Sequence, residues 1–332
     1  MKSRFFLSGF LILFMLAGLL SGCGAATQNQ NASTASGAST AAPNEATPAP
    51  QATANEKRVI KHELGETELT GKPQRIVVMD FSFADALATM GIQPVGISDD
   101  SDASLIIPEV KDKVGVYTSL GSRYEPNMEL ISSLAPDLII ADLNKHKAVY
   151  DKLKQIAPTI VLNDHQADYE HMLANYAVIA DAVGMTEEGK KRLDVHQAKM
   201  EEIKAKLPKA DAKLKVLPAV VNPTGFFAHS NASYAGSLME YLGMEDAAKS
   251  EEAYPKTNLE QLVALNPDVL FLMKTGDKTI VDEWETNPLW KNINAVKNGK
   301  VFEVARNKWA LSRGLIGSEL SAEEAVTLLL NK

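Results

Sequence analysis

Three arginines carry the strongest chemical signal in this sequence. Arg123 precedes the segment Glu-Pro-Asn at 125–127, and Arg306 and Arg313 flank the segment Trp-Ala-Leu-Ser at 309–312. A guanidinium group stays charged at physiological pH and donates two parallel hydrogen bonds to a carboxylate. Two such groups in one loop, beside a third and a histidine, favour an anionic ligand with several carboxylates. Each arginine could instead be an ordinary surface charge.

Further candidates stand just after predicted strands, where α/β proteins form their ligand sites. Lys145 and His146 follow residues 138–141, and Lys274 follows residues 269–272. Tyr124 is either a wall of the site or a core residue. The candidate ligand-binding residues are Arg123, Tyr124, Lys145, His146, His229, Lys274, Arg306, Trp309 and Arg313.

Motifs of the common catalytic and metal sites are missing from the sequence. It contains no G-x-S-x-G, G-x-x-x-x-G-K-[ST], G-x-G-x-x-G or H-E-x-x-H. None of the 6 histidines pairs with another at i, i+4, and the single cysteine excludes a thiolate-rich metal site. A calcium loop beginning at Asp100 fails, because Leu105 stands where glycine is needed. We predict a binding protein without catalysis, without a cofactor and without a metal ion held directly by its side chains.

The elements that must position these residues are short buried strands alternating with helices. Residues 75–79, 95–97, 138–141 and 159–162 are apolar runs without polar alternation, which is typical of strands covered on both faces. Residues 83–90, 128–134 and 168–183 have helical periodicity, and strands resume at 215–221, 269–272 and 301–304. The pattern predicts an α/β fold with mostly parallel strands.

A long charged helix is expected to separate two lobes. Residues 186–207 are strongly helix-forming, end at Pro208 and span about 30 Å, with His196 expected on the solvated face. The segments 127–139 and 258–270 match at an offset of 131 residues, although helix, Pro-Asp turn and strand could match by chance. Two similar lobes imply a cleft between them, the default place for a ligand.

The N-terminal part indicates export. Lys2 and Arg4 precede an apolar run at 5–20, and Leu-Ser-Gly-Cys at 20–23 ends on the only cysteine. Residues 24–55 lack Leu, Ile, Val, Met and aromatic residues, which predicts a disordered tether. A net charge of −8 argues against nucleic-acid binding through bulk charge. The expected organisation is a signal peptide at 1–22, a lipidated Cys23 and tether at 23–56, an N-terminal lobe at 57–185, a linking helix at 186–207 and a C-terminal lobe at 208–332.

Together these segments resemble a family. The lipobox-like segment, the tether, Arg-Ile-Val at 75–77, the stretch 120–130, Ile-Ala-Pro-Thr at 156–159 and the stretch 294–301 are similar to the siderophore-binding lipoproteins of bacterial iron(III) ABC importers. The stretch 309–316, with Arg306 before it, most resembles the branch for ferric citrate and other carboxylate siderophores. The resemblance implies a class III periplasmic-binding-protein-like fold, in which two Rossmann-like lobes are joined by one rigid helix.

The resemblance also implies ligand, partners and location. The ligand would be an iron(III)-siderophore complex, delivered by a monomer to a two-subunit permease with a cytoplasmic ATPase. The protein would be held by its lipid anchor on the extracytoplasmic face of the cell membrane. Acids from each lobe dock such proteins on permease arginines, and the repeat nominates Glu129 and Glu260, with Asp151 as a further candidate. Both glutamates could instead complement helix N-termini.

Two alternatives stay open at this point. The ligand could be haem, with His229 and a methionine such as Met79 as axial ligands and arginines on the propionates. A surface adhesin or cell-wall enzyme is a second alternative, which the missing motifs disfavour.

Overall fold

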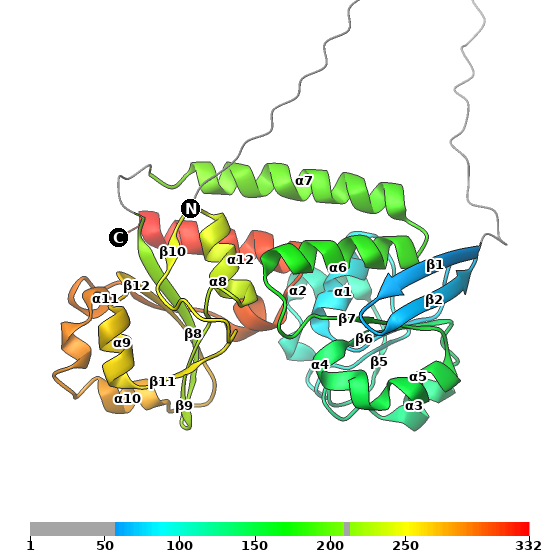
Figure 1. The fold of residues 1–332 in the computed structure, drawn as a ribbon, viewed down its shortest axis with the longest axis horizontal. Coiled ribbons are helices and arrows are strands. Elements are labelled where there is room, and N and C mark those ends of the chain that lie inside the picture. Colours follow the sequence, from blue (N-terminus) through cyan, green and yellow to red (C-terminus); the bar gives the residue numbers. More distant parts are fainter. Residues whose placement is uncertain (1–56, 209–212, 332) are drawn as a thin grey trace, which may run out of the picture. The chain divides into compact units, whose positions relative to one another are not determined.

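The computed structural model describes residues 57–208 and 213–331, all within one compact unit of the chain (Figure 1). The expected signal peptide, Cys23 and the tether lie outside these residues. Within the described part, no helix is both long enough and apolar enough to cross a membrane.

The first lobe is built on five parallel strands in the order β5-β4-β3-β6-β7. They are β3 (Ile76–Val78), β4 (Gly96–Ile97), β5 (Thr118–Ser119), β6 (Leu138–Asp142) and β7 (Thr159–Leu162). Val77 and Ile139 pack into one apolar cluster, whereas Val78 and Ile140 pack into another on the opposite face. The prediction of strands covered on both faces is therefore confirmed for this sheet.

Helices cover both faces of the first sheet, and a hairpin precedes it. The helices are α1 (Phe81–Thr89), α2 (Pro108–Val114), α3 (Met128–Ser133), α4 (Leu143–His146), α5 (Tyr150–Ile156) and α6 (Tyr169–Ala182), with 3-10 turns at Ala103–Leu105 and Lys147–Val149. The hairpin pairs β1 (Lys57–His62) with β2 (Gly65–Thr70). Asp80 and Asp142 begin α1 and α4 by accepting backbone N–H groups with their side chains. Because both caps stand at strand ends, they also bring carboxylates to the edge of the sheet where the site lies.

The second lobe holds a mixed sheet in the order β11-β9-β8-β12-β13, with β10 also beside β8. Its strands are β8 (Lys215–Asn222), β9 (Gly225–Ala228), β10 (Glu245–Asp246), β11 (Lys256–Thr257), β12 (Val269–Lys274) and β13 (Val301–Glu303). β9 runs antiparallel to both β8 and β11. Asn222 accepts the N–H groups of Thr224 and Gly225, which closes the tight turn between β8 and β9. The expectation of mostly parallel strands is therefore confirmed, and β9 is the antiparallel strand that it did not anticipate.

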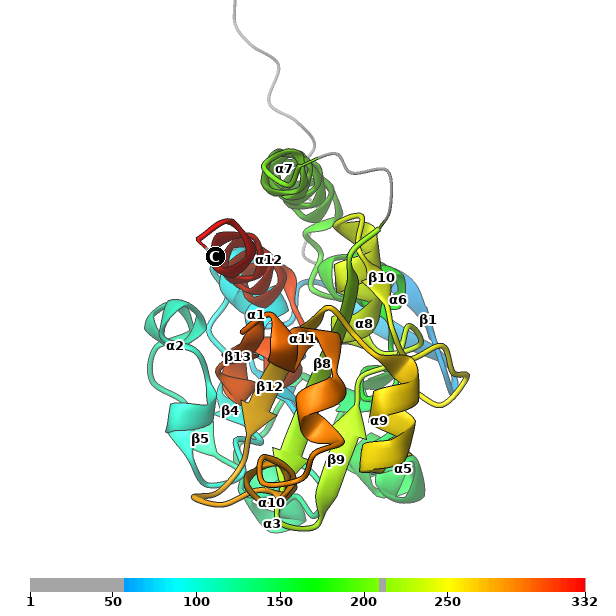
Figure 2. The same ribbon diagram turned by 90° about the vertical axis from the view of Figure 1, so that its left-hand side faces the viewer.

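Helices of the second lobe are α8 (Tyr234–Tyr241), α9 (Leu259–Leu265), α10 (Ile280–Trp284), α11 (Asn294–Lys297) and α12 (Leu315–Leu330), with a 3-10 turn at Trp290–Asn292. A π-helical turn, Asn307–Leu311, precedes α12. α9 and α11 lie over one face of the sheet, and α8 and α12 lie toward the other (Figure 2).

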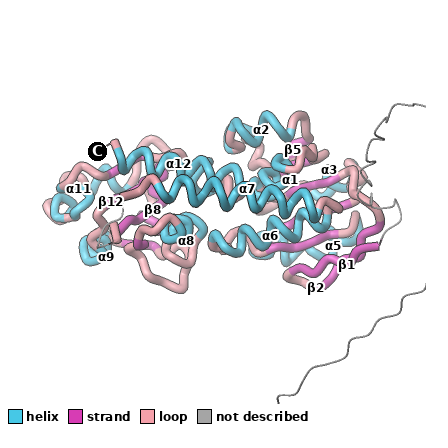
Figure 3. The backbone as a smooth tube through the Cα atoms, turned by 90° about the horizontal axis from the view of Figure 1, so that it is seen from above, coloured by secondary structure: helices cyan, strands magenta, loops and turns pink. Residues whose placement is uncertain are grey.

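The predicted linking helix is α7 (Thr186–Ala205), which packs against α6 of the first lobe and α12 of the second. Seen from above, it runs alongside both helices (Figure 3). α12 also packs against α1, and one apolar cluster contains Leu87 of the first lobe together with Phe271 of the second. The lobes are thus joined by a shared core as well as by α7.

His196 on α7 does not face solvent, so that expectation is wrong. Its side chain is buried between the hydroxyl of Tyr169, at 2.7 Å from Nε2, and the carboxylate of Glu319, at 2.7 Å from Nδ1. Glu319 also pairs with Arg192 on α7 at 2.7 Å. This polar side chain of α7 points inward because Tyr169 on α6 and Glu319 on α12 form hydrogen bonds with it. The periodicity of the sequence cannot reveal such partners.

Candidate ligand-binding site

A cavity of about 180 Å³ lies between the two lobes. Its lining residues are Arg123, Tyr124, His165, Val220, Phe227, His229, Tyr254, Arg306, Ala310, Leu311 and Arg313. Arg123 follows β5, His165 follows β7 and Arg306 follows β13. The cavity therefore sits at the carboxyl ends of strands from both sheets, as expected for an α/β binding site.

Arg123 is held by two carboxylates. Its Nη1 donates to Oδ1 of Asp80 at 3.1 Å, and its Nε and Nη2 donate to Oδ2 of Asp100 at 3.0 Å and 2.8 Å. The guanidinium also lies 4.4 Å from the centre of the Phe81 ring. Burial alone would lower the pKa of Arg123, but the carboxylates raise it, so the group stays charged. Its position is fixed before any ligand arrives.

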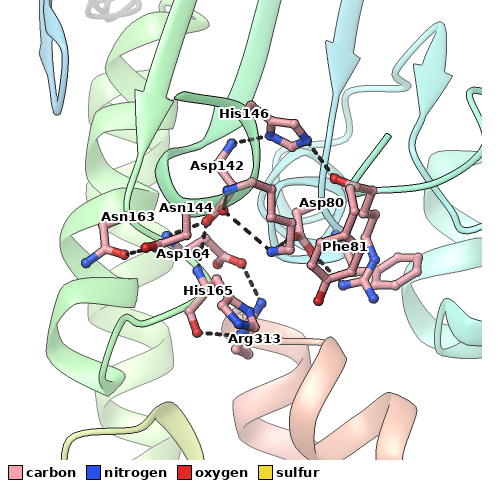
Figure 4. Close-up of polar contacts among 12 residues, drawn as sticks. Asp80, Phe81, Asp142, Asn144, His146, Asn163, Asp164, His165 and Arg313 are labelled. Atoms are coloured by element: carbon pink, nitrogen blue, oxygen red, sulfur yellow. Dashed lines mark hydrogen bonds and ion pairs between the residues drawn. The ribbon is translucent and has the colours of Figure 1, made fainter. Parts of the chain in front are cut away.

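Lys145 and His146 do not line the cavity but contact the groups that hold Arg123. Figure 4 shows His146 beside Asp142. Nζ of Lys145 lies 2.6 Å from Asp80 Oδ2. Nδ1 of His146 accepts the backbone N–H of Asp142 at 2.9 Å, so Nε2 carries the proton that it donates to the carbonyl of Arg123 at 2.7 Å. Both side chains are buried, and burial lowers the pKa of His146. We assign them a positioning role.

Arg313 connects the second lobe to the first. Its Nη2 donates to Oδ2 of Asp164 at 2.8 Å, and its Nη1 donates to the carbonyl of His165 at 3.1 Å (Figure 4). Burial lowers the pKa of Arg313, but Asp164, Tyr254 and two further carboxylates together raise it by more, so the guanidinium remains charged. Since both partners are buried, this ion pair between the lobes is shielded from water.

Arg306 differs from the other two arginines. Within residues 57–208 and 213–331, no carboxylate forms an ion pair with it, and burial together with repulsion from Arg123 lowers its pKa. Its charge is therefore the one in the cavity wall that a bound anion can neutralise most directly.

Three buried nitrogen atoms in the cavity wall have no hydrogen-bond partner among the described residues. They are Nδ1 of His229, Nε of Arg306 and Nε of Arg313. A buried donor left unpaired costs free energy, so native proteins rarely keep one without a reason. The two guanidinium N–H groups lack an acceptor oxygen, whereas Nδ1 of the neutral His229 donates or accepts according to its tautomer. The wall is thus equipped to bind a molecule rich in oxygen acceptors.

Two histidines flank Tyr254 in the cavity wall. The ring centres of His229 and His165 lie 4.8 Å and 5.5 Å from that of Tyr254. Burial and then Arg313 lower the pKa of His229 to about 3 and that of His165 to about 4. Both rings are therefore neutral at physiological pH, and positive charge in the wall comes from the arginines.

Acidification from about pH 6 to pH 4 should destabilise the wild type more than the variant His229→Asn. The unfolded chain protonates this histidine near pH 6.5, whereas the folded pKa is about 3. The stability that His229 contributes is therefore complete above pH 6.5 and is lost as the pH falls toward 3. Urea denaturation at several pH values should show that the difference in free energy of unfolding between wild type and His229→Asn changes by up to about 1.4 kcal/mol per pH unit. If the difference in unfolding free energy did not change with pH, it would contradict the conclusion that His229 is buried in its neutral form.

Five of the nine candidates from the sequence line the cavity: Arg123, Tyr124, His229, Arg306 and Arg313. Trp309 does not, because its indole packs 4.7 Å from Phe271 in the core and donates to Glu324 at 2.6 Å. Lys274 does not either, since it pairs with Glu303 at 3.0 Å on the outside of the second lobe. The structure therefore corrects the prediction for four residues that do not line the cavity: Lys145, His146, Trp309 and Lys274.

Several lining residues were missed from the sequence. His165 follows β7, so the strand-end rule could have found it. Tyr254 and Phe227 carry no such signal, because a loop between short strands and an inward position in β9 become visible only after folding. The carboxylates of Asp80, Asp100 and Asp164 were missed as partners of the arginines for the same reason.

The haem alternative is not supported by the position of Met79. This residue is fully buried in the apolar cluster on one face of the first sheet, together with Val77 and Leu120. It does not line the cavity that holds His229, so the two cannot ligate one iron atom from opposite sides.

Comparison with known proteins agrees with this geometry. A family model described as periplasmic binding protein matches residues 77–307. The Fe(3+)-citrate-binding protein YfmC of Bacillus subtilis is 44% identical over 277 residues, covering 83% of this chain and 87% of that protein. The Fe(3+) dicitrate-binding periplasmic protein FecB of Escherichia coli is 37% identical over 270 residues, covering 81% and 89%. The crystal structure of Staphylococcus aureus SirA complexed with staphyloferrin B has a TM-score of 0.74 at 24% identity, covering 82% of this chain and 98% of that one, and shows likeness of fold.

Proposed function

Because the chain belongs to the periplasmic binding protein family, we propose that it captures an iron(III) complex of a carboxylate ligand, ferric citrate being the first candidate. It then delivers this complex to the permease of an ABC importer. The protein acts by binding, not by catalysis, and needs no cofactor; iron is part of its cargo.

The proposal rests on the hydrogen-bond donors that line the cavity, which are the guanidinium groups of three arginines. Arg123, Arg306 and Arg313 line one small space, and Arg306 forms no ion pair with any described carboxylate. Arginines bind carboxylates through paired hydrogen bonds, so the contacts go to oxygens of the ligand and not to iron itself. The volume of about 180 Å³ lies below the roughly 300–1,000 Å³ of drug-sized sites, which favours a compact complex over a bulky one. The two relatives named for ferric citrate agree with this choice.

Calorimetric titration of the protein from residue 57 onward tests the ligand. Ferric citrate should bind tightly, and a ferric tris-catecholate should bind much more weakly because it offers no carboxylates to the arginines. Strong binding of the catecholate, or of haem with an intense Soret band, would reject the proposed ligand class.

Glu129 and Glu260 are the proposed contacts to the permease. Each is exposed in the first turn of its helix, α3 or α9, and each helix begins at an asparagine, Asn127 or Asn258, that caps it. The internal repeat of the sequence thus corresponds to the same local structure in both lobes. Each carboxylate is well placed to meet a cation of one permease subunit.

The double variant Glu129→Ala with Glu260→Ala should abolish uptake of iron supplied as ferric citrate, while the purified protein keeps its affinity for the complex. Without docking, the protein cannot deliver its ligand to the permease. Ligand binding is unaffected, because neither residue lines the cavity. Radiolabelled iron uptake in cells is the measurement. Glu187→Ala with Glu188→Ala, which removes the same charge from exposed positions on α7, is the control and should transport normally. Normal uptake by the first variant would move the docking surface elsewhere.

The anchor at Cys23 remains part of the proposal. Cys23→Ala should shift the protein from the membrane fraction to the soluble fraction, because a diacylated cysteine holds a protein at the membrane and alanine cannot be acylated. Fractionation followed by intact-mass measurement of the mature N-terminus decides this. Unchanged partitioning and mass would reject lipidation at this residue.

A further inference from the structure

A loop with unusual backbone geometry stands beside Arg123. Asp100 and Ser101 have φ values of 57° and 58°, in the left-handed region that residues other than glycine seldom adopt. The carboxylate of Asp99 holds the loop, accepting the N–H of Ser101 at 3.1 Å, the hydroxyl of Tyr117 at 3.0 Å and the hydroxyl of Ser119. Strained backbone that is held this firmly is characteristic of functional sites.

The loop presents the carboxylate of Asp100 to Arg123. Oδ1 accepts the backbone N–H of Arg123 at 2.8 Å, while Oδ2 accepts Nε at 3.0 Å and Nη2 at 2.8 Å. A ligand carboxylate would seek these same guanidinium N–H groups. The side chain of Asp100 is 26% exposed, unlike that of Asp80, which is fully buried, so only Asp100 has room to move.

The three arginines of the cavity are therefore unequally neutralised. Arg123 contacts two carboxylates and Arg313 contacts one, whereas no described carboxylate pairs with Arg306. We propose that Asp100 is a specificity-determining residue, an internal carboxylate that competes with the ligand for Arg123 and limits the negative charge that the site accepts. This inference rests on the proposed function and explains how an asymmetric anion would be oriented, with its most charged end toward Arg306.

Asp100→Asn is the direct test, because asparagine has the same shape and also tolerates the left-handed conformation. Removing one negative charge beside Arg123 should tighten binding of ferric citrate roughly tenfold, and the gain should shrink at high ionic strength. Asp102→Asn is the matched control. Asp102 lies in the same loop, but among the described residues its carboxylate accepts hydrogen bonds only from Ser104, so its variant should bind within about twofold of wild type. Weaker or unchanged binding by Asp100→Asn would overturn the proposal.

Iron-free citrate is titrated in parallel, so that the proposed function and this inference can fail separately. If wild type binds no ferric citrate, the proposed ligand is wrong; a gain in citrate affinity in Asp100→Asn alone would still support competition. If neither probe binds either protein, the competition is rejected as well. NMR gives a readout without ligand: solvent exchange of the Arg123 Nε–H should be faster in Asp100→Asn than in wild type and Asp102→Asn. Equal exchange rates would show that Asp100 does not hold the guanidinium, and would also overturn the proposal.

Discussion

Replacing Arg306 by alanine is expected to weaken ferric citrate binding by about 1.5–3 kcal/mol while leaving the stability of the protein unchanged or slightly higher. Its guanidinium has no ion pair among the described residues, and its buried Nε has no partner there, so its removal costs the folded protein no ion pair and no hydrogen bond of that nitrogen. The bound anion, in contrast, loses a charge-assisted hydrogen bond. Calorimetric titration and urea denaturation of the same samples provide the two measurements.

Two companion variants sharpen this result. Arg306→Lys should recover part of the affinity, because an ammonium restores the charge but not the planar fork. Lys308→Ala removes the same charge two residues further along, in the π-helical turn, where Lys308 pairs with Glu324 at 3.3 Å and does not line the cavity. It should bind like wild type. An Arg306→Ala protein with wild-type affinity would place the anion elsewhere.

Replacing Arg313 by alanine is expected to cost both binding and stability. Asp164 is buried, so removing its cation leaves an uncompensated charge, which typically destabilises a protein by about 3–5 kcal/mol. The lobes also lose the contact between Arg313 and the carbonyl of His165. Ferric citrate binding falls because the cavity loses one of its three arginines. Urea denaturation should therefore show a much lower midpoint, unlike that of Arg306→Ala.

The double variant Arg313→Ala with Asp164→Asn separates the two effects. Neutralising the stranded carboxylate should recover part of the stability without restoring ligand binding. Lys274→Ala, on the outside of the second lobe, is the control and should change stability by less than about 0.5 kcal/mol. If Arg313→Ala were as stable as wild type, the Arg313–Asp164 pair would not be the interlobe ion pair described above.

Much of the fold follows from local patterns in the sequence. Apolar runs without alternation identify strands buried on both faces, and those at 76–78, 138–142 and 159–162 lie where the runs predict them. The charged stretch after residue 185 becomes α7, ending at Ala205, two residues before the expected end. The antiparallel direction of β9 does not follow from such patterns, because a two-residue turn and a parallel crossover differ in turn chemistry and not in strand composition.

The positions of the arginines were also predictable, because residues just after parallel strands converge at one edge of the sheet. The number of carboxylates that pair with each arginine was not predictable. Sequence treats Arg123, Arg306 and Arg313 as equivalent charges, and only the tertiary structure assigns two carboxylates, none and one to them. These partners come from separate loops, so no local spacing encodes the pairing.

For the remaining candidates, the sequence could not predict the direction in which the side chain points. In the sequence, Trp309 stands between two arginines that line the cavity, but the π-helical turn Asn307–Leu311 shifts the helical phase and directs its indole to Phe271 in the core. His146 turns under Arg123 because a backbone N–H and a carbonyl there match its two ring nitrogens. The sequence by itself determined the main strands, the linking helix and the strand ends near which the three arginines lie, since these depend on periodicity and chain order. Which residues line the cavity and which hold their neighbours was decided by the tertiary structure, because that depends on contacts between segments far apart in the chain.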